Sequence, residues 1–442
     1  RHGDVVTFEE TGTYKLLFQI FADRPEELSS FYEQTLATLV KYDEQYQTEL
    51  VATLATYLEL DGNLAATAGI LAWRFAFGLG TVSNVNQEFP WGLWKGFNVI
   101  TGVAFAGGAY VLTFMVYVLR LEKYHSIVRA TVLNGLLAYC FYAGALVLDL
   151  GRPWKILNPI IGNSFGLSSV LFLVAWHFML YMMAQAVEFS PAAAEWMGAR
   201  RLHRILTGLT VGAVVFGITL STLHQSALGA LYAMAEPKVH PLWYSELIPL
   251  LFWVSSIFAG LSMVIVEGTL SKRMFVERMD PEHLRRHDGI MIDLARISGI
   301  TMFVYLFLEA TKFVHGSKWA YLTGGWAAWY AVEIVGCVAV PMVLLLAGSA
   351  RRDLTMVRAG AALTLVGIVL NRLNISVIAY KWYAPVHYVP GVMELIVSAG
   401  VLCAEIWAFR WIVMRMPVFG FEPAWAHPEP ERTFPPRLAA VA

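Results

Sequence analysis

Apolar runs recur along the chain after about residue 63, and short polar connections separate them. Each run has about 20 residues, which is the length that an α-helix needs to cross the hydrocarbon core of a bilayer. The pattern predicts an all-α polytopic membrane protein with about ten transmembrane helices, at residues 64–80, 93–119, 128–149, 167–189, 204–222, 246–269, 290–313, 327–347, 355–379 and 389–413.

The most polar interruption of this pattern lies at residues 220–250, LSTLHQSALGALYAMAEPKVHPLWYSELIPL. It ends one apolar run and begins the next, and it carries several hydrogen-bonding groups in quick succession: His224, Gln225, Ser226, His240 and Glu246. A chain that is apolar almost everywhere needs a reason to gather such groups at one depth. We expect this segment to join two helix bundles and to help roof a binding site.

The two ends of the chain differ from the apolar region between them. Residues 1–63 are acidic with a helical period, residues 64–415 form the transmembrane domain, and residues 416–442 form a Pro-rich tail that we expect to be disordered. The first 68 residues or so resemble the C-terminal helix-turn-helix region of PucR-type transcription regulators. No basic recognition helix follows, so we interpret the segment as a truncated fusion or gene-model junction and expect no nucleic-acid partner.

Basic residues gather in alternate connections, at 120–129, 200–204, 272–286, 351–358 and from 410 onwards. Connections rich in Lys and Arg face the cytoplasm in membrane proteins. We therefore expect a multi-pass protein of the bacterial inner membrane with both termini in the cytoplasm. Residues 220–250 would then lie on the outer face.

Composition agrees with a membrane protein and gives no sign of a bound metal. Hydrophobic residues make up 57% of the chain and charged residues 15%, against about 25% charged in soluble domains. Cys140, Cys337 and Cys403 are far apart, so neither a disulfide framework nor an iron–sulfur or zinc site is expected. Only His177 falls deep inside a predicted span, and a transmembrane haem needs a matched pair of histidines, so we expect no haem.

Several connections on the expected outer face combine Trp or Tyr with Gly, Pro and hydrogen-bonding side chains. An aromatic belt at the headgroup level explains some of these residues. The segments FPWGLW (89–94), DLGRPW (149–154), LHQSALGALY (223–232), HPLW (240–243) and IVEG (265–268) also closely resemble NrfD/PsrC-like membrane subunits, over about residues 70–415. The resemblance is closest to the HybB-type subunit of periplasmic uptake [NiFe] hydrogenases.

The resemblance implies two four-helix bundles side by side, formed by predicted helices two to five and six to nine, with helices one and ten outside them. It also implies a menaquinone or ubiquinone site near the outer surface. Electrons would come from a periplasmic iron–sulfur subunit and, through it, from a [NiFe] hydrogenase catalytic subunit, so that this oxidoreductase subunit is not catalytic alone. The alternatives are a polysulfide-, tetrathionate- or cytochrome-linked partner, or a passive membrane anchor without quinone chemistry.

Quinone reduction needs an apolar slot, donors to the two carbonyl oxygens and groups that deliver protons. We expect the catalytic residues to be His177, Asp149, His224 and Glu246. We expect the quinone-binding residues to be Trp91, Trp94, Asn98, Arg152, Gln225 and Ser226.

Structural interpretations of the same residues stay open. Asp149 could form a plain ion pair with Arg152, His177 could be a packed hydrogen-bonding group, and the polar residues from His224 could cap a helix end. Gly and Ala in helix two could serve helix packing.

Buried charges in the second predicted bundle also need partners or water. Arg372 is expected to pair with Glu333 or Glu394. If protons reach the quinone from the cytoplasm through His177 and internal carboxylates, turnover would move charge across the membrane.

Overall fold

The structure is a computed structural model that describes residues 66–156, 158, 166, 168–419 and 425. Residues from Thr67 onwards belong to one compact unit. The predicted segment 1–63, with its resemblance to PucR-type regulators, lies outside the described residues, as does almost all of the tail from 420 onwards. The boundaries of these two segments stay predictions.

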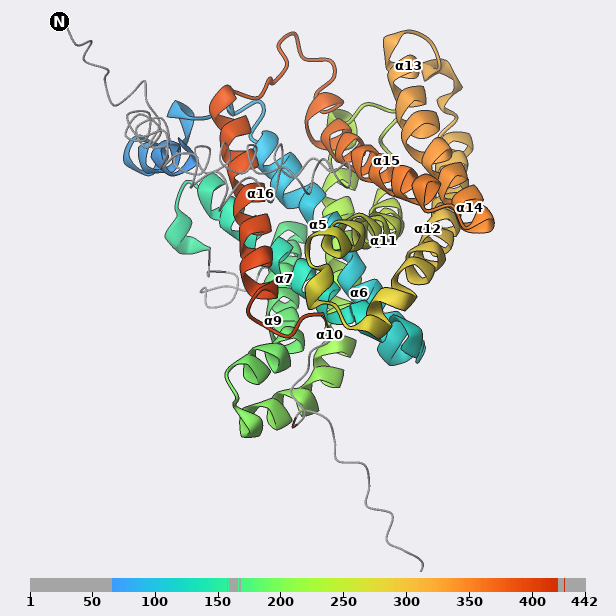
Figure 1. The fold of residues 1–442 in the computed structure, drawn as a ribbon. Helices are drawn as coiled ribbons and strands as arrows, with labels where there is room; N and C mark the ends of the chain where they lie inside the picture. Colours follow the sequence, from blue (N-terminus) through green and yellow to red (C-terminus); the bar gives the residue numbers. More distant parts are fainter. Residues whose placement is uncertain (1–65, 157, 159–165, 167, 420–424, 426–442) are drawn as a thin grey trace, which may run out of the picture. The chain divides into compact units, whose positions relative to one another are not determined.

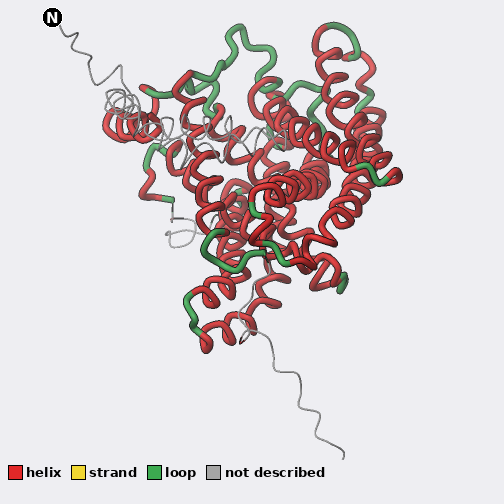
Figure 2. Tube along the Cα trace, in the orientation of Figure 1, coloured by secondary structure: helices red, strands yellow, loops and turns green. Residues whose placement is uncertain are grey.

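The described residues form an all-α protein, and nine of its helices are long and apolar enough to cross a membrane. This confirms the predicted fold class of a polytopic membrane protein (Figure 2). The first predicted span is different: it forms a helix only at Ala66–Phe77, about 18 Å long, which is shorter than the hydrocarbon core of about 30 Å.

The first bundle consists of four spans. The first of these runs from Trp94 to Val118 and has π-helical ends with α-helix between them. Its segments are η2 (Trp94–Thr101), α5 (Gly102–Phe105), α6 (Gly107–Thr113) and η3 (Phe114–Val118). The other three are α7 (His125–Asp149), α9 (Val170–Trp196) and α10 (Arg200–Ala233). The contacts close a ring from α6 to α7, α9, α10 and back to α6.

The second bundle repeats this arrangement with α11 (Ile248–Met274), α12 (Pro281–His315), a broken span and α15 (Leu354–Leu373). The broken span consists of α13 (Gly325–Ala331), η9 (Val332–Ala339) and α14 (Val340–Arg351), and α15 continues into η10 (Asn374–Ile378). The ring runs through α11, α12, α14 and α15, while α16 (Val392–Val413) packs outside it on α7 and η2 (Figure 1). The predicted pair of bundles with a peripheral last helix is confirmed.

Helix α10 is longer than the sequence pattern predicted. The expected end at residue 222 lies about three turns before the observed end at Ala233. The polar groups at His224 and Gln225 suggested a loop, but their side chains are buried inside the bundle while Leu223 faces outward. A buried polar side chain interrupts the hydropathy pattern without interrupting the helix. The connection between the two bundles is therefore confined to residues 234–247.

Four segments of the described spans are π-helical: η2, η3, η9 and η10. A π-turn inserts an extra residue, rotates the side chains that follow and frequently marks a functional site. Three of these segments carry a buried polar residue that matters below: Asn98 in η2, Glu333 in η9 and Asn374 in η10.

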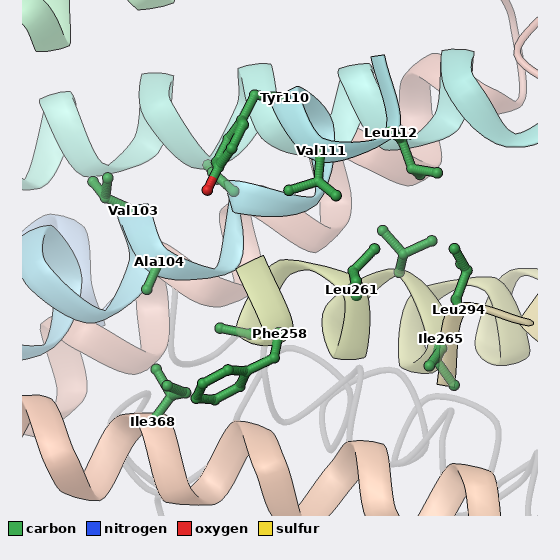
Figure 3. Packing of buried hydrophobic residues seen from close by; sticks show 14 of the residues in the cluster. Val103, Ala104, Tyr110, Val111, Leu112, Phe258, Leu261, Ile265, Leu294 and Ile368 are labelled. Carbon is green, nitrogen blue, oxygen red and sulfur yellow. The ribbon is translucent and has the colours of Figure 1, made fainter. Parts of the chain in front are cut away.

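The two bundles meet where α6 crosses α11 without intervening side chains. A β-carbon added to Gly260 would lie 1.9 Å from the backbone nitrogen of Gly108, and one added to Gly107 would lie 2.3 Å from the carbonyl oxygen of Ser256. Small residues at such a crossing allow two backbones to touch in the membrane. Figure 3 shows the apolar side chains that pack around this crossing, with Leu261 on α11.

We predict that Gly260→Ala destabilises the protein by about 1–3 kcal/mol, because the added methyl group overlaps the backbone of α6. Thermal unfolding of the full chain in detergent measures the effect. Gly212→Ala is the matched control, since a β-carbon there meets nothing within 4 Å. Equal unfolding temperatures for Gly260→Ala and the wild type would contradict the backbone contact.

Candidate functional site

The predicted site residues lie around one end of the helices, which we call the rim end. It carries the connections at residues 78–93, 150–156, 234–247 and 379–391, and the other end of the helices is called the opposite end. Buried polar atoms at the rim end that have no partner in the described chain indicate a candidate site, since each costs free energy unless a ligand or water satisfies it.

Helix α10 places His224 and Gln225 in the interior of the first bundle, where both are almost fully buried. His224 Nδ1 lies 3.1 Å from the carbonyl oxygen of Val174, and Gln225 Nε2 donates to the carbonyl oxygen of Val103 at 2.9 Å. These bonds leave His224 Nε2 and Gln225 Oε1 without a partner in the described part of the chain. Ser226 follows them but is only half-buried. The interpretation of these residues as a helix cap is wrong, because α10 continues to Ala233.

His177 lies beside this pair rather than in the middle of its span. It sits about two turns from Val170, the first residue of α9, and is half-buried. Its Nδ1 has no partner among the described residues, and its charge would act on His224. The structure therefore brings two predicted catalytic histidines together at the rim end.

The π-helix η2 carries Trp94 and Asn98, and Trp91 lies in the connection just before it. The Trp94 indole donates to the carbonyl oxygen of Glu394 at 3.0 Å, while the Trp91 ring packs edge-on against Tyr232 with centroids 5.8 Å apart. Asn98 is 1% exposed, and neither atom of its amide finds a partner in the described chain. Both a donor and an acceptor are thus left for a ligand in the same side chain.

Asp149 pairs with Lys95 and not with Arg152. The Asp149 carboxylate lies 2.6 Å from the Lys95 ammonium and is buried. The backbone becomes extended at Leu150, directly after α7, and carries Arg152 to an exposed position. Asp149 thus joins α7 to η2 at the rim end, whereas Arg152 lies outside the group of buried residues.

Glu246 is also separate from the buried group. It is exposed in the connection that precedes α11. Hydropathy does not distinguish a rim carboxylate that faces solvent from one that faces the bundle.

The second bundle holds a hydrogen-bonded network at the same end. Glu333 accepts from the Trp243 indole and from the Asn371 amide, both at 2.7 Å, and from Asn374. Arg372 bonds to Asn371 Oδ1 and Ser255 Oγ, each at 2.7 Å. The predicted direct pairing of Arg372 with Glu333 or Glu394 is wrong for the described chain, because Asn371 stands between the guanidinium and Glu333.

Glu394, the other carboxylate predicted to pair with Arg372, instead connects the start of α16 to neighbouring segments. It accepts from the Tyr388 hydroxyl at 2.5 Å and from the backbone of Asn84 and Gly391 at 3.0 and 2.9 Å. The Tyr388 hydroxyl in turn accepts from the amide of Leu93 at 2.9 Å. These bonds fasten the start of α16 to the segment before η2.

Three residues at the junction of the bundles were missed by the sequence reasoning: Tyr232, Phe252 and Ser376. Tyr232 lies two turns beyond His224 on α10, and its ring packs near Phe252 of α11 with centroids 6.0 Å apart. Ser376 donates to the carbonyl oxygen of Arg372 at 2.7 Å. Recognising that α10 continues past residue 222 would have placed Tyr232 on the same helix as His224.

A cavity of about 380 Å³ lies in the first bundle, near the opposite end. Val418 of the tail and polar residues of α6, η3, α7, α9 and α10 line it: Thr113, Tyr117, His125, Arg129, Glu188, Glu195, His203, Thr207 and Thr210. Arg129 and His203 pair with Glu195 at 2.8 and 2.9 Å. Glu188, in contrast, has no hydrogen bond or ion pair among the described residues, and a cavity of this size has room for water beside it.

His240 belongs to the connection between the bundles but is a structural residue. Its Nδ1 accepts from the amide of Leu242 at 3.2 Å, and its ring packs against Trp382 and Trp326 at 4.9 and 5.0 Å. Burial and the nearby ammonium of Lys318 lower the pKa of His240 to about 4. The imidazole is therefore neutral at physiological pH.

We predict that acid weakens the fold around His240. Its folded pKa of about 4 is below the ordinary value of 6.5, so the unfolded chain binds the extra proton first and stability falls as pH drops through this window. His240→Asn keeps an acceptor for Leu242 and does not titrate. Unfolding temperatures between about pH 7 and about pH 5 should fall less in the variant than in the wild type. Equal slopes would contradict the assignment.

Groups of three or more His, Cys, Asp or Glu residues that could hold a metal ion do not occur within the described ranges. The buried polar groups are instead suited to a ligand that both donates and accepts hydrogen bonds in an apolar setting.

Comparison with known proteins agrees with this architecture. Residues 81–384 match the family model described as "Polysulphide reductase, NrfD". A protein of Nitratidesulfovibrio vulgaris is 38% identical over 80% of this chain and 91% of its own length. The "Probable Ni/Fe-hydrogenase 2 b-type cytochrome subunit" of Escherichia coli is 30% identical over 79% of this chain and 88% of its own length.

A more distant relative is the "Menaquinone reductase, integral membrane subunit" of N. vulgaris, which is 25% identical over 68% of this chain and 75% of its own length. The family model covers more than half of the chain, and it falls on the spans that form the two bundles. The chain therefore belongs to the NrfD family of integral membrane proteins.

Proposed function

We propose that this chain is the quinone-reactive membrane subunit of a multi-subunit respiratory oxidoreductase. It would take electrons from an iron–sulfur subunit docked at the rim end and pass them to menaquinone or ubiquinone. The observation that carries the proposal is the set of unpartnered polar atoms on His224, Gln225 and Asn98 in the rim-end half of the first bundle. Trp91 packs against Tyr232, which lies on the same helix as His224. A quinone ring is apolar with two carbonyl oxygens, and such a ligand would use these groups.

The catalytic roles follow from chemistry at these atoms. Each quinone must gain two electrons and two protons to become a quinol. His224 Nε2 and His177 Nδ1 are free to exchange protons, and the Asp149–Lys95 pair would hold a charged rim beside η2. Asn98 and Gln225 would orient the carbonyl oxygens. Ser226, Trp94 and Arg152 would support the site from further away.

The names of the relatives favour particular partners. The E. coli relative is named as a hydrogenase subunit and one N. vulgaris relative as a menaquinone reductase subunit, so we propose an uptake [NiFe] hydrogenase as the electron source and menaquinone as the acceptor. A polysulfide-, tetrathionate- or cytochrome-linked complex is the second candidate, favoured by the description of the family.

The proposal includes no haem in this subunit. A transmembrane b-type haem needs two histidines on facing helices with space between them. The His224 ring is packed instead against Tyr139 and Phe178, with centroids 5.9 and 5.5 Å away. The words "b-type cytochrome" describe the E. coli relative.

We also propose that the rim end faces the periplasm and the opposite end the cytoplasm of the bacterial inner membrane. The helix ends at Arg200, Arg273 and Arg351 support this orientation, because all three lie at the opposite end.

Protons for the quinone would come from the opposite end through the first bundle. Glu188 lines the cavity there, and its carboxyl lies against Gly217, near the Tyr181 ring. The Tyr181 ring lies 4.8 Å from that of Tyr139, which in turn lies 5.9 Å from that of His224. This sequence of polar side chains supports a route from the cavity to His224 and His177, and such a route would make turnover electrogenic.

We predict that His224→Gln lowers quinone-dependent turnover of the intact complex about a hundredfold, the contribution expected of a positioned acid or base. Reduction of a soluble dye by the partner subunits should stay at the wild-type rate, since that reaction bypasses the membrane subunit. His315→Gln is the matched control, because this exposed histidine also lies at the rim end. Wild-type quinone turnover in His224→Gln, together with no inhibition by quinone analogues, would favour a passive anchor.

We predict that His177→Ala and Glu188→Gln each abolish charge translocation by the complex in proteoliposomes, because each interrupts the route. A voltage-sensitive dye measures the charge moved for each quinone reduced. Unchanged translocation in both variants would remove the proton route while leaving quinone reduction in place. Glu282→Gln is the control, since this carboxylate is exposed at the start of α12.

A further inference from the structure

Two buried hydrogen-bond donors at the junction of the bundles have no role in the account so far. They are the hydroxyl of Tyr232 on α10 and the Nε–H of Arg372 on α15. Neither makes a hydrogen bond of good geometry within the described part of the chain, although Tyr232 is 3% exposed and Arg372 1%. Ser376 lies near the Tyr232 hydroxyl, but its own hydroxyl donates to the carbonyl oxygen of Arg372. The two side chains lie within electrostatic range of each other. A pair of unsatisfied buried donors calls for an acceptor oxygen.

The guanidinium of Arg372 is held firmly by its other nitrogens. Nη1 donates to Asn371 Oδ1 and Nη2 to Ser255 Oγ, both at 2.7 Å, and the guanidinium carbon lies 3.7 Å from the centre of the Phe252 ring. Asn371 in turn donates to Glu333 at 2.7 Å. The side chain of Asn371 therefore separates the guanidinium of Arg372 from the carboxylate of Glu333. Because Arg372 has no direct contact with this carboxylate, it can attract an anionic group of a ligand.

Aromatic rings lead from the rim to this cation. The ring of Trp91 lies 5.8 Å from that of Tyr232, and the ring of Tyr232 lies 6.0 Å from that of Phe252. Phe252 is the residue that stacks under Arg372. Flat apolar rings that end at two donors suit a flat ligand with an oxygen at its tip.

We propose that Tyr232 and Arg372 form an oxyanion-binding pair for one carbonyl oxygen of the quinone. The inference rests on the proposed function. As the quinone takes up two electrons from the iron–sulfur partner, negative charge grows on this oxygen, and the two donors stabilise that charge in a water-poor setting. The two protons that complete the quinol come from other groups, so neither Tyr232 nor Arg372 changes its own protonation. Asn371 and Glu333 act as positioning residues that hold the guanidinium in place.

A hydroxyquinoline N-oxide, a flat inhibitor with a polar oxygen, provides a direct binding test. It is titrated into the purified full-length chain, and its fluorescence quenching reports binding. Loss of one neutral hydrogen bond in Tyr232→Phe should weaken binding about two- to tenfold, and loss of the charged donor in Arg372→Gln about ten- to a hundredfold. Since both donors serve one oxygen, the double variant should lose less than the product of the two single effects.

Two substitutions of the same type serve as controls. Tyr124→Phe removes the hydroxyl of a buried tyrosine at the opposite end of the first bundle, and Arg358→Gln removes an arginine from the opposite end of α15. Both should bind the inhibitor as the wild type does. If Arg372→Gln fails to fold, Tyr232→Phe alone decides, since it removes a single oxygen whose one neighbouring polar side chain in the described chain is Ser376.

The outcomes separate this inference from the function on which it rests. Wild-type binding that is weakened by Tyr232→Phe or Arg372→Gln, and not by the controls, supports the oxyanion pair. Wild-type binding that neither substitution changes overturns the pair and leaves the quinone proposal standing, with buried water as the partner of the two donors. Absence of binding to the wild type, together with absence of quinone reduction by the intact complex, overturns the proposed function itself.

Discussion

The structure depends on the contact between the backbones of α6 and α11. Gly107 and Gly108 meet Ser256 and Gly260 with no room for a β-carbon, and the Tyr110 hydroxyl bonds to Ser256 Oγ at 2.9 Å beside this crossing. In a bilayer the hydrophobic effect does not drive helices together, so close packing and hydrogen bonds must do so. This crossing fixes the two bundles relative to each other. The polar residues that reach their junction from η2, α10, α11 and α15 are therefore held in place before any ligand binds.

Buried polar groups in this protein fall into two classes. Glu333 and Glu195 bond to neighbouring side chains through both carboxylate oxygens, as expected of charges in an apolar medium. The other class, with His224 and Asn98 among its members, is buried equally deeply but leaves donors or acceptors free. Stability alone does not explain the second class, because an apolar residue would cost less at the same position. A ligand or a proton route does explain it.

The spans and the pairing of the bundles could be predicted, because hydropathy and family segments report on them directly. The contacts of individual polar residues could not. Hydropathy shows that His224 interrupts an apolar run, but a buried side chain on a continuous helix gives the same signal as a loop. The partner of Asp149 was missed because Lys95 is remote in sequence, while Arg152 is near in sequence and turned away by the backbone at Leu150. The free donors on Tyr232 and Arg372 depend on which side chains the neighbouring helices bring to the junction, and no spacing rule reports it.

The central claim is that a quinone binds at the junction of the bundles on the rim side. Photoaffinity labelling of the intact complex with an azidoquinone, followed by peptide mapping, tests it most directly. The account predicts labelled peptides from η2, from the rim-end half of α10 and from α15 with η10, and predicts that excess unlabelled quinone prevents labelling. Labels confined to the opposite end, around the cavity near Glu188, or spread evenly over lipid-facing helices, would contradict it.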